Sequence, residues 1–447
     1  MVAASVPMFM TTLDNLVMTG ALPVIQAHLG ADMAELQWFL NAYTLSFATL
    51  MLAASSLGDR WGRRRTFVAG IALFTLASIV SALATTPAAL IVARALQGAG
   101  GAAIMPLSLT LLAGAVPRER RAMAIGVWGG VSGLGVALGP LIGGAVVEGL
   151  SWRAIFWVNV PVALVAIPLV RRYLHESYGR REPLDVAGLL LVGVGILALV
   201  WGIVHGNDDG WTSVGVVGSF TTTVVLLVAF VRRQSRIPNP LVPLRLFRSR
   251  SFSVANATGF AFSLGMFGAV FLLVQSLQVL NGYSPLEAGI RTLPWTAAPM
   301  LVAPLAGLLA PRIGVRALLA AGLAAQSVGL AWIAVRVGDG SAYGTLVPGF
   351  VLAGVGMGLT FAPSSTAVLQ DMPDADHATA SSTNATVREV GVALGVAVLA
   401  AVFQASGGAL TPEGFATGLR PAILTGAAVV AVGALAALSL PRRDMQH

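Results

Sequence analysis

The chain has 447 residues, of which 56% are hydrophobic and only 10% are charged, against roughly 25% charged residues in a typical soluble domain. This composition excludes a soluble globular protein and a disordered chain, and the absence of cysteine excludes disulfides and cysteine-ligated metals. The net charge of +8 comes from arginines clustered between apolar runs, which favours contact with the anionic inner leaflet of a membrane and argues against nucleic acid as a partner.

Fourteen apolar runs follow one another along the chain, each close to the ~20 residues that a helix needs to cross a bilayer. They predict an all-α polytopic membrane protein. The first run lacks a basic start, so we expect a retained helix and not a cleaved signal peptide. Most arginines fall in loops on one side of the membrane, which predicts both termini in the cytoplasm. The runs are 3–25, 36–57, 66–85, 88–113, 122–147, 153–171, 186–205, 213–231, 252–280, 286–310, 317–337, 345–369, 381–404 and 419–440.

The two ends of the chain repeat one another. Segment 55–64, after the second run, matches segment 307–316, after the tenth, in the pattern Leu-x-x-Arg-x-Gly-x-Arg. Gly-Val-Ala-Leu-Gly at 135–139 recurs at 391–395, an offset of 256 residues. Runs 1–6 therefore repeat as runs 9–14, the plan of one large class of secondary transporters. The predicted domains are a six-helix bundle (1–171), a two-helix insert with flanking cytoplasmic loops (172–250) and a second six-helix bundle (251–447).

Four motifs lie in order along the first half of the chain. They are Leu13-Asp14 through Leu22-Pro23, the loop at 55–64, Arg94-Ala-Leu-Gln97-Gly98-Ala-Gly100, and Gly135-x3-Gly139-Pro140-x2-Gly143-Gly144. Together they resemble the major facilitator superfamily, specifically its 14-helix drug:proton antiporter branch. The resemblance implies two six-helix bundles with a site at the midplane between them, and efflux of organic compounds in exchange for protons.

The loop motif places a carboxylate among arginines where two helices turn within a few residues. Gly62 permits the tight turn, and Asp59 can pair with an arginine or with a helix N-terminus. We expect a cytoplasmic latch that holds the inner side shut in the outward-facing state. Solvated arginines that only set the topology are the alternative. The predicted latch residues are Asp59, Arg60, Gly62, Arg63 and Arg64.

The fifth run carries a glycine stripe with a proline in it. Gly135, Gly139 and Gly143 share one helix face, so another helix backbone can approach closely. Pro140 removes a backbone donor and favours a kink, and Gly144 adjoins the stripe. We predict a hinge-like helix interface, with ordinary glycine packing as the alternative.

Ionisable side chains at bilayer depth are expensive and usually functional. Asp14 lies in the first run, Arg94 in the fourth, and Arg388 and Glu389 in the thirteenth. Burial raises the pKa of a carboxyl group and a neighbouring arginine lowers it, so a proton could be taken up and released as the site changes its access. The resemblance also implicates Arg94 in proton coupling. We predict that these four residues couple protons to transport, against the alternative of structural ion pairs.

Other side chains are candidates for a substrate cavity, because they place polar or aromatic groups inside apolar runs. Deep tryptophans also serve in ordinary packing, which is the alternative for this set. The candidates are Gln97, Trp128, Trp157, Asn159, Gln275 and Trp295.

These features predict a proton-coupled efflux transporter for amphipathic drugs or antibiotic-like natural products, working by alternating access. We expect a monomer in a bacterial inner membrane, driven by the proton motive force without a cofactor or metal, since the five histidines are scattered. Uptake or export of another small solute is the main alternative, because one fold hosts many substrates. A non-transporting sensor is a further one. A nucleotide-driven pump is not expected, because the P-loop motif is absent.

Overall fold

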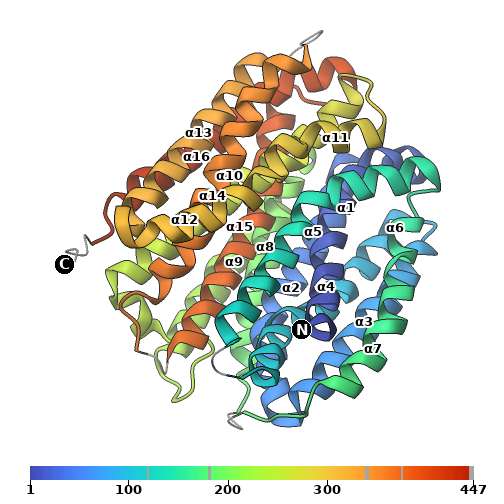
Figure 1. Ribbon diagram of the computed structural model, residues 1–447. Helices are drawn as coiled ribbons and strands as arrows, with labels where there is room; N and C mark the ends of the chain where they lie inside the picture. The colour runs from blue at the N-terminus through green and yellow to red at the C-terminus, as the bar shows by residue number, and fades with distance from the viewer. Residues whose placement is uncertain (118–119, 180–182, 338–341, 374–375, 442–447) are drawn as a thin grey trace. The chain divides into compact units, whose positions relative to one another are not determined.

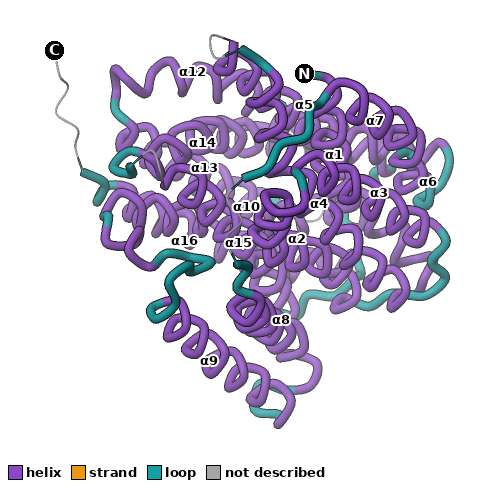
Figure 2. The backbone as a smooth tube through the Cα atoms, turned by 90° about the horizontal axis from the view of Figure 1, so that it is seen from below, coloured by secondary structure: helices purple, strands orange, loops and turns teal. Residues whose placement is uncertain are grey.

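The computed structural model describes residues 1–117, 120–179, 183–337, 342–373 and 376–441, and these segments form helices and loops without a strand (Figure 2). In these described segments, fourteen spans are long and apolar enough to cross a membrane. The predicted number of spans and the all-α fold class are therefore confirmed.

The first six spans come from seven helices and the remaining eight from nine. The first set is α1 (Val2–Leu29), α2 (Met33–Trp61), α3 (Arg63–Ala82), α4 (Pro87–Ala115), α5 (Arg121–Gly149), α6 (Ala154–Trp157) and α7 (Asn159–Tyr173). The second set is α8 (Val186–Asp209), α9 (Val214–Gln234), α10 (Arg250–Val279), α11 (Pro285–Thr296), α12 (Ala298–Ile313), α13 (Val315–Arg336), α14 (Tyr343–Leu369), α15 (His377–Ala405) and α16 (Pro412–Ala437), with the short 3-10 helix η2 (Leu244–Arg248) before α10.

Two spans that the sequence predicts as single helices are broken in the structure. The sixth divides into α6 and α7, and the tenth into α11 and α12. Proline lacks the N–H that would bond to the carbonyl four residues earlier. Pro161 and Pro299 follow the breaks at Val158 and Ala297, so a missing N–H group accompanies each break.

The helices fall into two compact units. The first comprises Met1–Leu197, Val225–Leu241 and Ser284–Ile290, and the second Ala198–Val224, Val242–Tyr283 and Arg291–His447. In the first unit α1 packs on α5, and α2 and α3 pack on α4 (Figure 1). In the second, α10 packs on α15 and α13 packs on α14. The boundaries at 171 and 250 stay a prediction.

The same close helix contacts occur in both units. A Cβ atom added to Gly98 would meet the carbonyl oxygen of Tyr43, and one added to Gly354 would meet that of Trp295. Gly98 and Gly354 are 256 residues apart, and Tyr43 and Trp295 are 252 apart. The offsets are those of the sequence repeat, so the repeated glycines serve one packing geometry.

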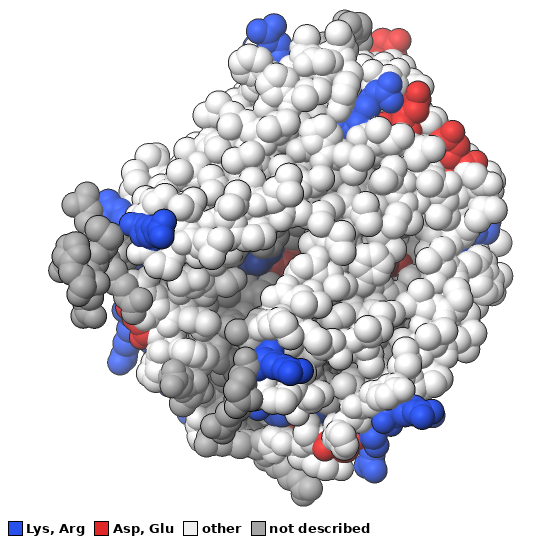
Figure 3. All heavy atoms as spheres, in the orientation of Figure 1, with Lys and Arg blue, Asp and Glu red and all other residues white. Residues whose placement is uncertain are grey.

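Charged side chains are sparse on the face shown in Figure 3, where most of the surface is uncharged and the arginine and acidic groups lie mainly toward the edges. Helices α8 and α9 lie side by side (Figure 2). In the most apolar 18-residue stretch of each helix, only 22% and 17% of the residues are buried inside the protein. Exposed valines and leucines on these helices are what a lipid-facing surface requires.

Candidate functional site

The carboxylate of Asp14 lies inside the first unit and accepts three side-chain hydrogen bonds. Arg94 Nη1 is 2.5 Å from Oδ2 and forms an ion pair with it. Gln97 Nε2 and Asn159 Nδ2 donate to Oδ1 at 2.8 and 2.9 Å. Ser78 Oγ accepts from the same two amides at 2.9 and 3.2 Å. We call these five residues the carboxylate cluster.

The cluster is buried and is assembled from four helices, α1, α3, α4 and α7. The side chain of Arg94 is fully buried and that of Asp14 is 2% exposed. Arg94 also donates from Nε to the Phe39 carbonyl at 3.0 Å, and its guanidinium carbon lies 4.4 Å from the centre of the Tyr43 ring. A buried charge is tolerated only when paired and hydrogen-bonded, and Asp14 meets both conditions.

The sequence predicts Asp14 and Arg94 as functional residues, and the structure brings them into contact. Gln97 and Asn159, predicted to line a substrate cavity, place their amides against Asp14. Ser78 was not among the predicted residues. Serine is common in membrane helices, and only the hydrogen bonds that Ser78 accepts from Gln97 and Asn159 in the folded chain single it out.

The loop after α2 forms a second site. Asp59 pairs with Arg63 at 2.7 Å. Gly62 has φ +113°, in the region that favours glycine, and a Cβ atom there would lie 2.7 Å from the Glu176 side chain. Glu176 accepts from the backbone N–H groups of Arg64 and Arg65 at 2.8 and 3.2 Å. The segment after the sixth span therefore covers the N-terminus of α3.

Further hydrogen bonds hold the loop after α2 to the segment after the sixth span. Arg64 donates to the Leu174 carbonyl at 3.1 Å, and the backbone N–H of Gly179 donates to the Asp59 carbonyl at 3.1 Å. At the repeated position Gly314, a Cβ atom would have no neighbour within 4 Å. Of the two copies of the loop, only the first carries an acid at the position of Asp59, because Pro311 replaces it in the second.

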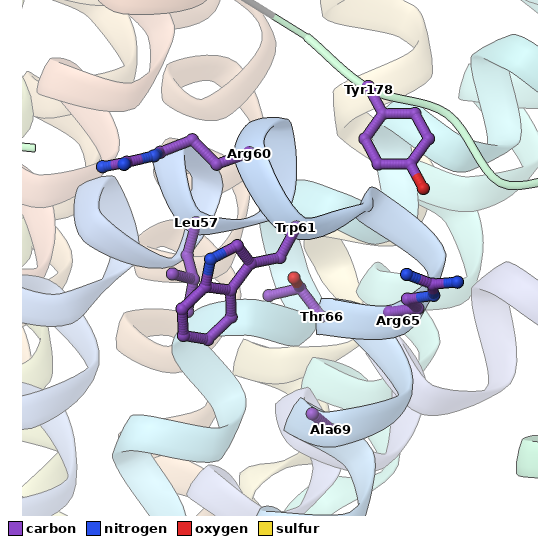
Figure 4. A pocket seen from close by; sticks show the side chains of 7 residues that line it. All are labelled: Leu57, Arg60, Trp61, Arg65, Thr66, Ala69 and Tyr178. Carbon is purple, nitrogen blue, oxygen red and sulfur yellow. The ribbon is translucent and has the colours of Figure 1, made fainter. Parts of the chain in front are cut away.

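A pocket of 540 Å³ adjoins this loop. Figure 4 shows the exposed indole of Trp61 between Arg60 and Arg65, with Tyr178 and Ala69 on opposite sides of them. Arg60, predicted for the latch, lines this pocket, whereas Arg63 and Arg64 hold the loop contacts.

The glycine stripe of α5 packs on α1. A Cβ atom at Gly139 would lie 2.6 Å from Leu16 Cβ, and one at Gly143 would lie 3.0 Å from Val17 Cα. Gly135 faces Thr12 in the same way, at 3.2 Å.

The neighbouring face of α5 contacts the first residues of α11. A Cβ atom at Gly144 would lie 2.7 Å from Leu286 Cα, and one at Gly289 would meet the Pro140 carbonyl. Glu148 accepts from the Leu286 N–H at 3.2 Å. The glycine stripe and Pro140 thus let two helices approach α5 closely, α1 on one face of α5 and α11 on the adjacent face.

Arg388 and Glu389 belong to α15 in the second unit. The Arg388 guanidinium carbon lies 4.5 Å from the centre of the Phe361 ring. Arg388 and Glu389 are both partly exposed. They stay predicted proton-coupling residues.

The remaining predicted cavity residues are spread over several helices. Trp128 is half-buried and bonds to Ser108 Oγ at 3.0 Å. Trp295 is buried and stacks on Phe350. Gln275 bonds to the Phe271 carbonyl of its own helix. Trp157, expected deep in a span, ends the short helix α6 and is 43% exposed. In the described chain no group of three or more metal-ligating side chains is placed to hold an ion.

The model of the Major Facilitator Superfamily matches residues 5–396. The chain belongs to this superfamily. It is 36% identical over 407 residues to the multidrug resistance protein Stp of Mycobacterium tuberculosis (strain CDC 1551 / Oshkosh), covering 91% of this chain and 75% of that protein. It is 32% identical over 425 residues to the tetracenomycin C resistance and export protein of Streptomyces glaucescens, covering 95% and 79%.

The fold is also that of solved superfamily transporters. A POT family transporter bound to a thioalcohol-conjugated peptide aligns with a TM-score of 0.72 over 97% of this chain and 94% of that one, at 15% identity. With its bacterial efflux relatives and fourteen apolar spans, this superfamily member is a multi-pass protein of the bacterial inner membrane.

Proposed function

We propose that the chain exports an amphipathic organic compound in exchange for protons that move inward, by alternating access. The names of the two relatives above, a multidrug resistance protein and a resistance and export protein, support this direction and class of substrate. The single observation that carries the proton part is the buried carboxylate of Asp14, whose ion-pair partner is the equally buried Arg94.

The cluster has a chemical asymmetry that suits a proton switch. The polar groups that Asp14 contacts are donors: a guanidinium and two amide nitrogens. A proton on Asp14 would cancel the ion pair and turn one carboxylate oxygen into a donor that faces other donors. Protonated Asp14 therefore requires the cluster to rearrange, which ties proton uptake to a change of structure.

Arg94 has acceptors that can hold it after such a change. Gln97 Oε1 lies 2.6 Å from Nη1, and the Phe39 carbonyl lies 3.0 Å from Nε. Arg94 of α4 thus bonds to Asp14 of α1 and to the Phe39 carbonyl of α2. Loss of the Asp14–Arg94 bond would therefore loosen α1 from its neighbours. The loop at Asp59, Gly62 and Glu176 would hold the cytoplasmic ends together in one of the two access states.

The energy required is available without a nucleotide or other cofactor. Each proton that crosses the membrane releases about 2.3 kcal/mol per 100 mV, before the pH gradient is added. The proton motive force is therefore the proposed energy source.

The proposal can be tested with a panel of toxic compounds in a host stripped of its own efflux pumps. Wild type, Asp14→Asn and the control Asp209→Asn, an exposed acid at the end of α8, are compared at equal membrane expression. We expect wild type and the control to raise tolerance to at least one compound and Asp14→Asn to abolish it. Full tolerance with Asp14→Asn would refute the proton role.

A further inference from the structure

The second unit contains an arginine that differs from Arg94 in its surroundings. Arg388 Nε is buried and has no hydrogen-bond partner among the described residues. The guanidinium instead lies over the ring of Phe361, at 4.5 Å. Arg94 is neutralised by Asp14, whereas Arg388 forms no hydrogen bond or ion pair with a described residue. Its next neighbour Glu389 lies about 100° further around the helix, since successive residues in an α-helix are separated by that angle.

A pair of asparagines from α10 and α15 lies near Arg388. Asn384 Nδ2 donates to Asn256 Oδ1 at 3.2 Å, one turn from Arg388. Gly259 leaves room for the arginine, because a Cβ atom there would lie 3.3 Å from Arg388 Cγ.

Aromatic rings border the same place. Phe361 packs on one face of the guanidinium, and Phe262 meets Phe361 edge-on with ring centroids 5.2 Å apart. An arginine held by a ring keeps its N–H groups at the edge of the guanidinium plane free for a planar acidic group. A cation of this kind inside a membrane span is expected to face a pathway for a solute.

We propose that Arg388 binds the acidic group of the exported compound, so that the substrate class includes amphipathic organic anions such as carboxylates and sulfonates. The acidic group pairs with the guanidinium edge, Asn384 adds a polar contact, and Phe361 and Phe262 contact the apolar part. This assignment rests on the proposed export function and names the chemistry of its substrate. It gives Arg388 a role in substrate binding, distinct from that of the Asp14–Arg94 pair.

The test is a binding measurement on the purified full chain in nanodiscs, without any gradient. The probes are 1-anilinonaphthalene-8-sulfonate, an amphipathic anion, and N-phenyl-1-naphthylamine, the matching neutral compound, each corrected for empty nanodiscs. We expect Arg388→Gln to weaken the affinity for the anion by about tenfold or more, as loss of a charged hydrogen-bonded pair does. Arg388→Gln should leave the affinity for the neutral probe unchanged. The control Arg232→Gln, at an exposed arginine at the end of α9, should leave the affinity for the anion unchanged.

Two further variants keep the test informative if Arg388→Gln fails to fold. Arg388→Lys keeps the charge but loses the fork geometry, so its affinity for the anion should fall less. Glu389→Gln removes a nearby negative charge, so anion binding should tighten. Equal anion binding by wild type, Arg388→Gln and Arg388→Lys, equal weakening of both probes, or no anion binding by wild type would each overturn the assignment. Because no gradient is present, these results are independent of whether Asp14 drives proton-coupled export.

Discussion

Arg94 in α4 and Phe350 in α14 hold equivalent positions in the two repeats, 256 residues apart, and one is a cation where the other is an aromatic ring. Arg94 lies over Tyr43, at 4.4 Å from the ring centre. Phe350 stacks on Trp295 with ring centroids 5.8 Å apart, and Trp295 is the repeat counterpart of Tyr43. In both repeats a side chain packs on the aromatic ring at this position, Tyr43 or Trp295, but only the first repeat has a charged side chain there. The carboxylate cluster therefore belongs to the first repeat alone.

The Asp14–Arg94 ion pair should be essential for coupling protons to transport, but an uncharged pair should be able to replace it without much loss of folding stability. Removing one partner of a buried ion pair costs about 3–5 kcal/mol, because the other charge stays buried without compensation. Asp14→Asn should therefore lower the thermal unfolding temperature, and the double variant Asp14→Asn/Arg94→Gln should recover most of the loss. Neither variant should transport in response to a pH gradient.

The measurements are thermal unfolding in detergent and substrate flux in proteoliposomes with and without an imposed pH gradient. Transport by the double variant at the wild-type rate would show that the pair only stabilises the fold. A double variant that is as unstable as Asp14→Asn would show that the two charges do not compensate one another.

Glu176 should hold the start of α3 to the segment after the sixth span. A carboxylate at a helix N-terminus contributes through its bonds to free N–H groups and through the helix dipole. We expect Glu176→Gln to raise the amide exchange rate of the peptide around Arg64 and Arg65 by about fivefold, a change of roughly 1 kcal/mol. Hydrogen–deuterium exchange with mass spectrometry measures it.

Glu413→Gln supplies the comparison, because Glu413 lies in the first turn of α16, far along the chain. It should leave exchange around Arg64 unchanged. If Glu176→Gln also had no effect there, the contact would be held by the other bonds, those of Arg64 to the Leu174 carbonyl and of the Gly179 N–H to the Asp59 carbonyl.

The sequence predicts the members of the carboxylate cluster better than their contacts. Asp14 and Arg94 can be recognised because charges inside apolar runs are rare, but their pairing joins residues 80 positions apart. Glu176 escapes notice because it lies in a loop, where acids are usually solvated. Only the folded chain shows that it meets the backbone of Arg64.

The number and order of the spans follow from hydropathy, since each crossing needs a fixed length of apolar residues. The breaks before Pro161 and Pro299 do not, because prolines are tolerated in many membrane helices. Pro140 illustrates this, as α5 continues through it from Arg121 to Gly149. Whether a proline divides a span depends on the packing of its neighbours.

Asp185 gives a prediction about pH, outside the membrane spans. Burial raises the pKa of Asp185, but bonds from the Gly188 N–H, Arg233 and Gln234 outweigh it and hold the pKa below its usual value. A carboxyl group with a lowered pKa in the folded state stabilises the protein above its unfolded pKa, and the effect is lost as the pH falls through the folded value.

The stability difference between wild type and Asp185→Asn should therefore be constant from pH 8 to about pH 5, begin to shrink near pH 4 and disappear only as the pH falls through the lower pKa of the folded state. Thermal unfolding in detergent across this range measures it, with Asp371→Asn as an exposed control. A difference that grew as the pH fell would contradict the assigned direction of the pKa shift.

The glycine stripe of α5 offers a test within a single helix. Gly139 faces Leu16 of α1 at a distance that leaves no room for a side chain, whereas a Cβ atom at Gly133 has no neighbour within 4 Å. Overpacking of a close contact costs about 1–3 kcal/mol, so Gly139→Leu should lower both the unfolding temperature and the turnover number. Gly133→Leu adds the same side chain where there is space and should leave both near wild type. Wild-type turnover with Gly139→Leu would show that close approach of α1 and α5 is not needed for transport, and equal losses in both variants would show that the effect is on α5 itself.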